Sequence, residues 1–272
     1  MLEKANNRST SDRYAWVDFI RGFCILIIVI CHTVKGSFGY APGLQEWFTV
    51  FMINTFFILS GLLAKETKFQ LKEIIRKRFG SLIIPYILYS VIILMANFIL
   101  FCFRQVSLVN IIGAVYKTIV LSGIGTLWFI PVLFGVQLIF NYVLISKNYK
   151  VKAFYAVSLL GSICYVIICQ RIRSEELIFQ VINAPLITVA KTIIASVFFY
   201  IGYIIKPLLF SVRSNSRNFV IGLIWIFSSF LVGRRISGYD FNQLILPNPI
   251  KYILVSMFCS LSLVHCTAAA YN

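Results

Sequence analysis

The sequence YAWVDFIRGFCILIIVICHTVK, residues 14–35, is a membrane-length apolar run that carries three ionisable side chains. Asp18 and Arg21 lie near its start and His32 near its end. At about 100° per residue, a helix returns Arg21 and His32 to one face after about three turns, roughly 16 Å along the axis. Because charged groups are costly in hydrocarbon, we expect this face to point into the protein or a water-filled cavity.

The composition indicates a polytopic membrane protein. Of the 272 residues, 60% are hydrophobic and 12% are charged, and the mean hydropathy is +0.88. Soluble domains are about 45–50% apolar and about 25% charged. The net charge of +16 is explained by Lys and Arg in cytoplasmic loops, so we expect the lipid bilayer as a partner and no nucleic acid. The cysteines all lie in apolar runs without a C-x-x-C pair, so we expect no metal site.

Eight apolar segments are long enough to cross a bilayer. They are about residues 17–34, 48–64, 79–103, 127–145, 153–169, 186–205, 219–232 and 250–268. The segment 106–121 is more typical of a re-entrant or interfacial helix, and Pro207 is expected to end the sixth span. We therefore predict an all-α transmembrane bundle of eight to nine helices. Lys and Arg are more numerous on the side that holds the polar residues 1–13, so we expect a cytoplasmic N-terminus.

The spacing of Asp18, Arg21 and His32 leaves two interpretations open. In the functional one, His32 accepts the proton of an alcohol, since histidine titrates near neutral pH. Arg21 then holds an anionic group or stabilises an oxyanion, and Asp18 orients Arg21. In the other, Asp18 and Arg21 are interfacial residues and His32 lies at the level of the lipid headgroups.

The second apolar segment contains FMINTFFILSGLLA, residues 51–64. Its Ser60–Gly61 pair lets another helix or a ligand approach closely. Asn54 is an amide inside an apolar helix, where it needs a hydrogen-bond partner, so it is a candidate for the same cavity.

Two further segments carry candidate binding residues. The run IIRKRFGSLIIP, residues 74–85, contains Arg76, Lys77 and Arg78, which either bind phosphates or only fix the orientation in the membrane. The run LWFIPVLF, residues 127–134, contains Trp128, which either lines a ligand site or is an interfacial aromatic residue.

In this order the four segments resemble the membrane-bound acyltransferase 3 family. The first matches a V/I-D-x-x-R-G motif followed, eleven residues after the Arg, by a His. The second matches F-F-x-x-S-G and the third R/K-R-x(5–7)-P, and the fourth resembles L-W-F-L-x-x-L-F, with Ile130 at the fourth position. The match runs from Tyr14 to about Phe134.

The resemblance implies transfer of an acyl group, often acetyl, from acyl-CoA to a sugar hydroxyl of a cell-surface polysaccharide or its lipid-linked precursor. It implies an O-acetyltransferase of the bacterial cytoplasmic membrane, with acetyl-CoA as a donor substrate and no permanently bound cofactor. The catalytic residues would be His32, Arg21 and Asp18. The residues that bind the CoA phosphates would be Arg76, Lys77 and Arg78, and those that contact the substrate would be Asn54, Ser60 and Trp128.

The chain also departs from the family pattern. Relatives in the sugar O-acetylase branch have a His and a Pro in the segment where Phe51 and Asn54 stand. Relatives have about ten membrane helices, so residues 14–272 are expected to form a single acyltransferase-like domain that lacks the last helices. Two alternatives therefore stay open: a non-catalytic polysaccharide export or transport component, and an inactive truncated acyltransferase. We see no internal repeat of the kind that is typical of transporters.

Overall fold

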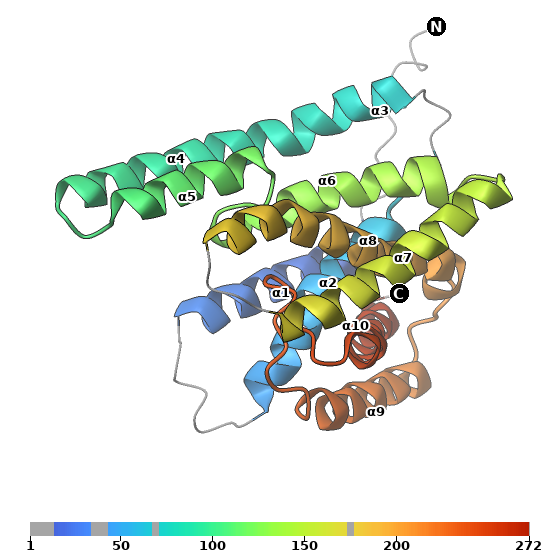
Figure 1. Cartoon of the computed structure of the whole chain (residues 1–272). Helices are drawn as coiled ribbons and strands as arrows, with labels where there is room; N and C mark the ends of the chain where they lie inside the picture. Colours follow the sequence, from blue (N-terminus) through green and yellow to red (C-terminus); the bar gives the residue numbers. More distant parts are fainter. Residues whose placement is uncertain (1–13, 34–42, 67–70, 173–176, 272) are drawn as a thin grey trace, which may run out of the picture.

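The computed structural model describes residues 14–33, 43–66, 71–172 and 177–271. Over these ranges the chain is a bundle of α-helices, in which a bridge between Asp240 and Ile245 is the only β pairing (Figure 1). Seven of the described helical segments are long and apolar enough to cross a membrane. The predicted all-α membrane bundle is confirmed, and the polar residues 1–13 lie outside the described ranges.

Each predicted span coincides with a helix. The longer helices are α1 (Ala15–Thr33), α2 (Leu44–Leu62), α4 (Ile84–Cys102), α7 (Tyr149–Arg171), α8 (Leu177–Phe210), α9 (Ser216–Gly233) and α10 (Pro249–Tyr271). The shorter ones are α3 (Leu71–Arg78), α5 (Leu108–Ile119) and α6 (Phe129–Ile139). Helix α2 is not among the seven segments, and it includes the polar residues Gln45, Glu46 and Asn54.

Helix α2 lies at the centre of the bundle and packs against α1, α8, α9 and α10. Its contact with α8 is made by glycine on both helices. A Cβ atom at Gly61 would overlap the carbonyl oxygen of Phe199, and one at Gly202 would overlap the carbonyl oxygen of Ile58. The two backbones therefore touch directly, which is how small residues pack membrane helices.

Two π-helical segments interrupt the helices near one end of the bundle. The first, η2 (Phe79–Ile83), joins α3 to α4, and the second, η4 (Phe140–Leu144), extends α6. A short 3₁₀ turn, η3 (Gly125–Trp128), precedes α6 at the other end. Single π turns inside α-helices are frequent at functional sites.

Helix α8 is longer than predicted, and the expectation that it ends at Pro207 is wrong. It runs from Leu177 to Phe210 through both Pro185 and Pro207. Because Pro185 has no backbone N–H, the carbonyl oxygen of Val181 loses its normal helical donor. The Tyr116 hydroxyl of α5 donates to that oxygen instead, at 2.5 Å, so a neighbouring helix supplies the missing hydrogen bond.

Helices α4 and α5 form a hairpin that extends away from the rest of the bundle (Figure 1). The Tyr86 hydroxyl of α4 donates to the carbonyl oxygen of Thr118 at 3.0 Å and ties the two helices together. The 12 residues of α5 are fewer than the about 20 that a membrane crossing needs. This agrees with a segment that does not cross on its own.

Candidate functional site

Two arginines converge at one end of α1. A cavity of about 180 Å³ lies between α1, α2, α3 and α6, next to both π-helical segments. We call it the arginine cavity. Its polar lining residues are Arg21, Ser60, Lys65, Arg78, Gln137 and Asn141. The structure thus brings together three predicted residues from three segments of the sequence.

Asp18 and Arg21 pair on the same face of α1. The Nη1 atom of Arg21 lies 3.8 Å from Oδ1 of Asp18, and both side chains are partly exposed. An exposed pair at this spacing adds little stability, typically about 0.3–0.5 kcal/mol. Its main consequence is orientation, because the carboxylate limits where the guanidinium can point.

The arginine cavity also contains an unsatisfied acceptor. The Oε1 atom of Gln137 is buried and has no hydrogen-bond partner among the described residues. The main-chain oxygen of Gln137 accepts a hydrogen bond from Nδ2 of Asn141 at 2.7 Å. A buried acceptor without a donor costs about 1–3 kcal/mol, and a ligand with an N–H or O–H group would remove that cost.

A second cavity, of about 660 Å³, lies at the other end of α1 and contains His32. We call it the histidine cavity. Its aromatic lining residues are Phe56, Trp128, Phe129, Tyr239 and Phe241. Its polar lining residues are His32, Thr49, Thr126, Asp240 and Asn242. It therefore combines one candidate base with aromatic faces and several hydrogen-bonding groups.

The two cavities follow one another along the same helices. On α1, Arg21 lines the arginine cavity and Ile25 lines the histidine cavity. On α2, Ser60 lines the arginine cavity and Phe56 lines the histidine cavity. Both pairs are four residues apart, which is one helical turn and about 6 Å. The Phe56 and Phe129 rings, with centroids 5.8 Å apart, pack in the histidine cavity at this boundary.

Trp128 is 3% exposed and lines the histidine cavity. The Lys191 ammonium of α8 lies 4.5 Å from the centre of its ring, and Phe241 contacts its edge at 5.9 Å between centroids. These two contacts fix the orientation of the indole ring.

The remaining predicted residues lie elsewhere. Asn54 is fully buried and donates to the carbonyl oxygen of Val50 at 2.8 Å and to the Tyr252 hydroxyl at 2.9 Å. It therefore ties α2 to α10. Arg76 and Lys77 are exposed on α3, whereas Arg78, beside them, lines the arginine cavity.

Sequence reasoning missed the loop that closes the histidine cavity. Residues 234–248 join α9 to α10 and contribute Tyr239, Asp240, Phe241 and Asn242. The loop is held by the two main-chain hydrogen bonds between Asp240 and Ile245, each 2.9 Å long. Its signal in the sequence is the alternation of aromatic and polar residues between two membrane segments, which is no established motif.

Sequence reasoning also missed Gln137 and Asn141. Two amides four residues apart inside an apolar span are a usable signal, because polar side chains within a membrane mark functional interiors. They share one helix face, and that face lines the arginine cavity.

The comparisons with known proteins bear on the whole chain. A family described as an acyltransferase domain matches residues 14–272. The searches of curated proteins and of solved structures gave no match. The family match covers every described helix. It includes the C-terminal half of the chain, which contains none of the four sequence motifs. The chain therefore belongs to the acyltransferase 3 family and is a multi-pass membrane acyltransferase.

Proposed function

We propose that this protein transfers an acetyl group from acetyl-CoA to a hydroxyl of a cell-surface glycan sugar or of its lipid-linked precursor. The observation that carries the proposal is the alignment of the two cavities along α1 and α2, one helical turn apart. The basic cavity suits the donor and the aromatic cavity suits a sugar.

The donor would bind in the arginine cavity. Coenzyme A carries phosphate groups, which Arg side chains bind through paired N–H donors. Arg21 and Arg78 both line this cavity. The pantetheine arm carries amide N–H groups, and one of them would satisfy the buried Oε1 of Gln137.

The acceptor would bind in the histidine cavity. Sugar rings present apolar C–H faces that pack against aromatic rings, and their hydroxyls need hydrogen-bond partners. The Trp128 and Tyr239 rings supply such faces, while Asp240 and Asn242 supply polar groups beside them.

In the reaction, His32 would accept the proton of the acceptor hydroxyl as its oxygen bonds to the acetyl carbonyl carbon. The carbon–sulfur bond of the thioester then breaks, and the histidine returns the proton to the sulfur of CoA. For this the pantetheine arm must pass from the arginine cavity into the histidine cavity. Because Arg21 lies about 16 Å from His32 along α1, we assign it to the donor phosphates rather than to the oxyanion, with Asp18 orienting it.

We also propose that the arginine end faces the cytoplasm of a bacterial cell. Coenzyme A is a cytoplasmic metabolite, and the basic helix α3 lies at the same end as the arginine cavity. Basic residues next to membrane spans favour the cytoplasmic side. In this orientation the N-terminus would lie in the cytoplasm, and the histidine cavity would face the opposite side of the membrane.

The direct test uses the purified full chain in lipid nanodiscs with radiolabelled acetyl-CoA and a panel of neutral and acidic saccharides. We expect time-dependent label in a saccharide product, released by mild alkali as an O-acetyl ester should be. Wild-type protein that binds acetyl-CoA but labels no saccharide would contradict the proposal.

A second experiment separates the enzyme from an export component. The O-acetyl content of surface polysaccharide is measured by proton NMR in cells with the gene deleted and restored. An acetyltransferase predicts loss and return of the acetyl signal with the amount of polysaccharide unchanged. An export component predicts the opposite pattern.

A further inference from the structure

A third cavity, of about 660 Å³, adjoins the histidine cavity. The two share Gly125 and Asn242 in their walls. We call the third one the lysine cavity. Its hydrogen-bonding lining includes two lysines and four amides: Lys117, Lys191, Gln180, Asn183, Asn242 and Gln243. Its described lining contains no Asp or Glu, so its side chains carry only positive formal charge.

Lys191 is the central feature of this cavity. It lies within the membrane-spanning part of α8 and is only 2% exposed. Its ammonium donates to the main-chain oxygen of Asn242 at 2.5 Å and to Oδ1 of the same residue at 3.5 Å, and it lies over Trp128. These partners are neutral, whereas buried charges in proteins are normally paired with an opposite charge.

Asp240, the acid of the 234–248 loop, offsets the charge of Lys191 only in part and through space. Asp240 lines the histidine cavity, and its Oδ1 accepts the backbone N–H of Gln243 at 3.1 Å. No ion pair in the described part of the chain joins it to Lys191. An intramembrane lysine beside a cavity is therefore available to an anionic ligand.

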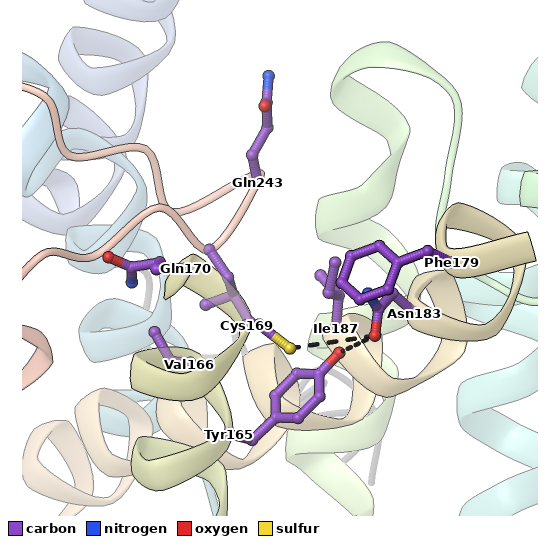
Figure 2. Close-up of a pocket in the computed structure, with 9 residues that line it drawn as sticks. Tyr165, Val166, Cys169, Gln170, Phe179, Asn183, Ile187 and Gln243 are labelled. Atoms are coloured by element: carbon purple, nitrogen blue, oxygen red, sulfur yellow. Dashed lines mark hydrogen bonds between the residues drawn. The ribbon is translucent and has the colours of Figure 1, made fainter. Parts of the chain in front are cut away.

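The amides of the lysine cavity suit a sugar. Asn183 lies on α8, and its Oδ1 accepts a hydrogen bond from the Tyr165 hydroxyl of α7 at 2.9 Å and faces the Cys169 sulfur (Figure 2). With Oδ1 occupied, Asn183 offers a ligand its Nδ2 donor. Gln243 projects from the 234–248 loop, as Figure 2 shows. Amide groups of this kind donate to and accept from sugar hydroxyls.

We infer that the lysine cavity binds a phosphate or carboxylate group of the sugar acceptor, so that the acceptor is an anionic saccharide. This inference rests on the proposed function and narrows its acceptor class. The anionic group would contact Lys191 and Lys117, while the rest of the sugar passes Gly125 and Asn242 into the histidine cavity. The reacting hydroxyl is then on a different part of the saccharide from the anion.

The test compares acceptors that differ in one charge, using wild-type protein in nanodiscs. Glucose 1-phosphate and glucuronic acid are the anionic probes, and methyl glucoside is the neutral one. We expect kcat/KM for the better anionic acceptor to exceed that for the neutral one at least tenfold. Lys117→Gln, a change at an exposed position, should reduce this preference at least threefold, and Lys191→Gln should reduce it further. Lys251→Gln, which removes the same charge from an exposed position outside the cavity, should not.

A binding measurement keeps this inference separate from the proposed function. Saturation-transfer NMR with glucose 1-phosphate reports occupancy without turnover. If Lys117→Gln weakens this binding and Lys251→Gln does not, the result supports the site even when no acetyl transfer occurs. Efficient transfer with equal kcat/KM for neutral and anionic sugars would overturn the inference and leave the proposed function standing. A Lys117→Gln effect confined to the KM for acetyl-CoA would also overturn it.

The source of the anion is resolved by presenting it in two ways. Polyprenyl-phosphoglucose is added to the nanodisc lipid in one arm, and soluble glucose 1-phosphate is added in the other. A lower KM in the lipid arm assigns the phosphate to a lipid-linked sugar, and a lower KM in the soluble arm assigns it to a free acidic glycan. If the KM values in both arms were unchanged by Lys117→Gln and Lys191→Gln, the result would contradict the site.

Discussion

The arginine and histidine cavities are lined by successive stretches of the same two helices, yet their chemistry differs. The smaller one is polar and basic, and the larger one is lined by aliphatic and aromatic side chains with a single histidine. One turn of α1 separates Arg21 from Ile25, and one turn of α2 separates Ser60 from Phe56. The comparison shows how one scaffold can recognise two unlike substrates without a second domain.

The two cavities also differ in what builds them. The arginine cavity is lined mostly by helical residues, including those of the π-helical segment η4. The histidine cavity needs the 234–248 loop and the turn at Gly125. Because loops vary more readily than packed helices, acceptor preference is expected to be easier to change than donor preference.

Removal of the histidine is expected to have the largest effect on activity. We expect His32→Ala to lower kcat for acetyl transfer by about 10²–10⁴-fold, the usual contribution of a general base. The KM for acetyl-CoA should stay the same, because the donor phosphates bind at the other cavity. His265→Gln is the control, since this second histidine packs against Trp225, with ring centroids 4.9 Å apart, outside both cavities. Full activity of His32→Ala in nanodiscs would refute the proposed mechanism.

A substitution between α2 and α8 should remove both cavities together. At Gly61, the methyl group of Ala would overlap the Phe199 carbonyl oxygen, and overpacking costs about 1–3 kcal/mol. Alanine is favoured over glycine by about 1 kcal/mol in helix propensity. Whether the substitution destabilises the protein therefore depends on the cost of the overlap. We expect Gly61→Ala to lower Tm and to impair donor and acceptor binding alike.

Gly161→Ala is the matched control for this prediction, because nothing lies within 4 Å of a Cβ at that position of α7. It should leave Tm unchanged or raise it slightly. If Gly61→Ala impaired only one cavity, the shared α2–α8 contact would not be what positions both.

The sequence predicted the helices well because membrane spans are specified locally. Apolar runs of about 20 residues must form helices in lipid, since every backbone group has to be satisfied within the segment. The same local view underestimated the length of α8, because a rule about proline in one helix leaves out hydrogen bonds from neighbouring helices, such as the one at Pro185. Tyr116, which compensates for Pro185, lies far away in the sequence.

The candidate site was predictable only where residues share one helix. Asp18, Arg21 and His32 could be placed on a common face from their spacing alone. The separation of Arg78 from Arg76 and Lys77 could not, because three adjacent basic residues differ only in which way they point once α3 packs against α6. Asn54 was correctly expected to need a partner, but that partner, Tyr252, comes from the last helix.

Neutralising single arginines of α3 tests whether the donor binds in the arginine cavity. We expect Arg78→Gln to raise the KM for acetyl-CoA about tenfold, which corresponds to about 1.4 kcal/mol, while kcat changes little. Arg76→Gln removes the same charge from an exposed position of the same helix and should leave KM within about twofold. Equal effects of the two variants would mean that α3 acts only through its overall charge, and the assignment of the donor to the arginine cavity would fail.

The smallest expected effect tests the unsatisfied amide of the arginine cavity. Gln137→Leu keeps a similar volume and the main-chain oxygen that Asn141 contacts, but it removes the buried Oε1. Without a ligand this oxygen is a cost, so we expect the variant to raise Tm by a few degrees. If the donor supplies the missing N–H, the same variant should raise the KM for acetyl-CoA about threefold to fivefold. Stability and affinity would then move in opposite directions, which a purely structural role for Gln137 does not predict. Gln105→Leu, at an exposed turn after α4, should change neither quantity.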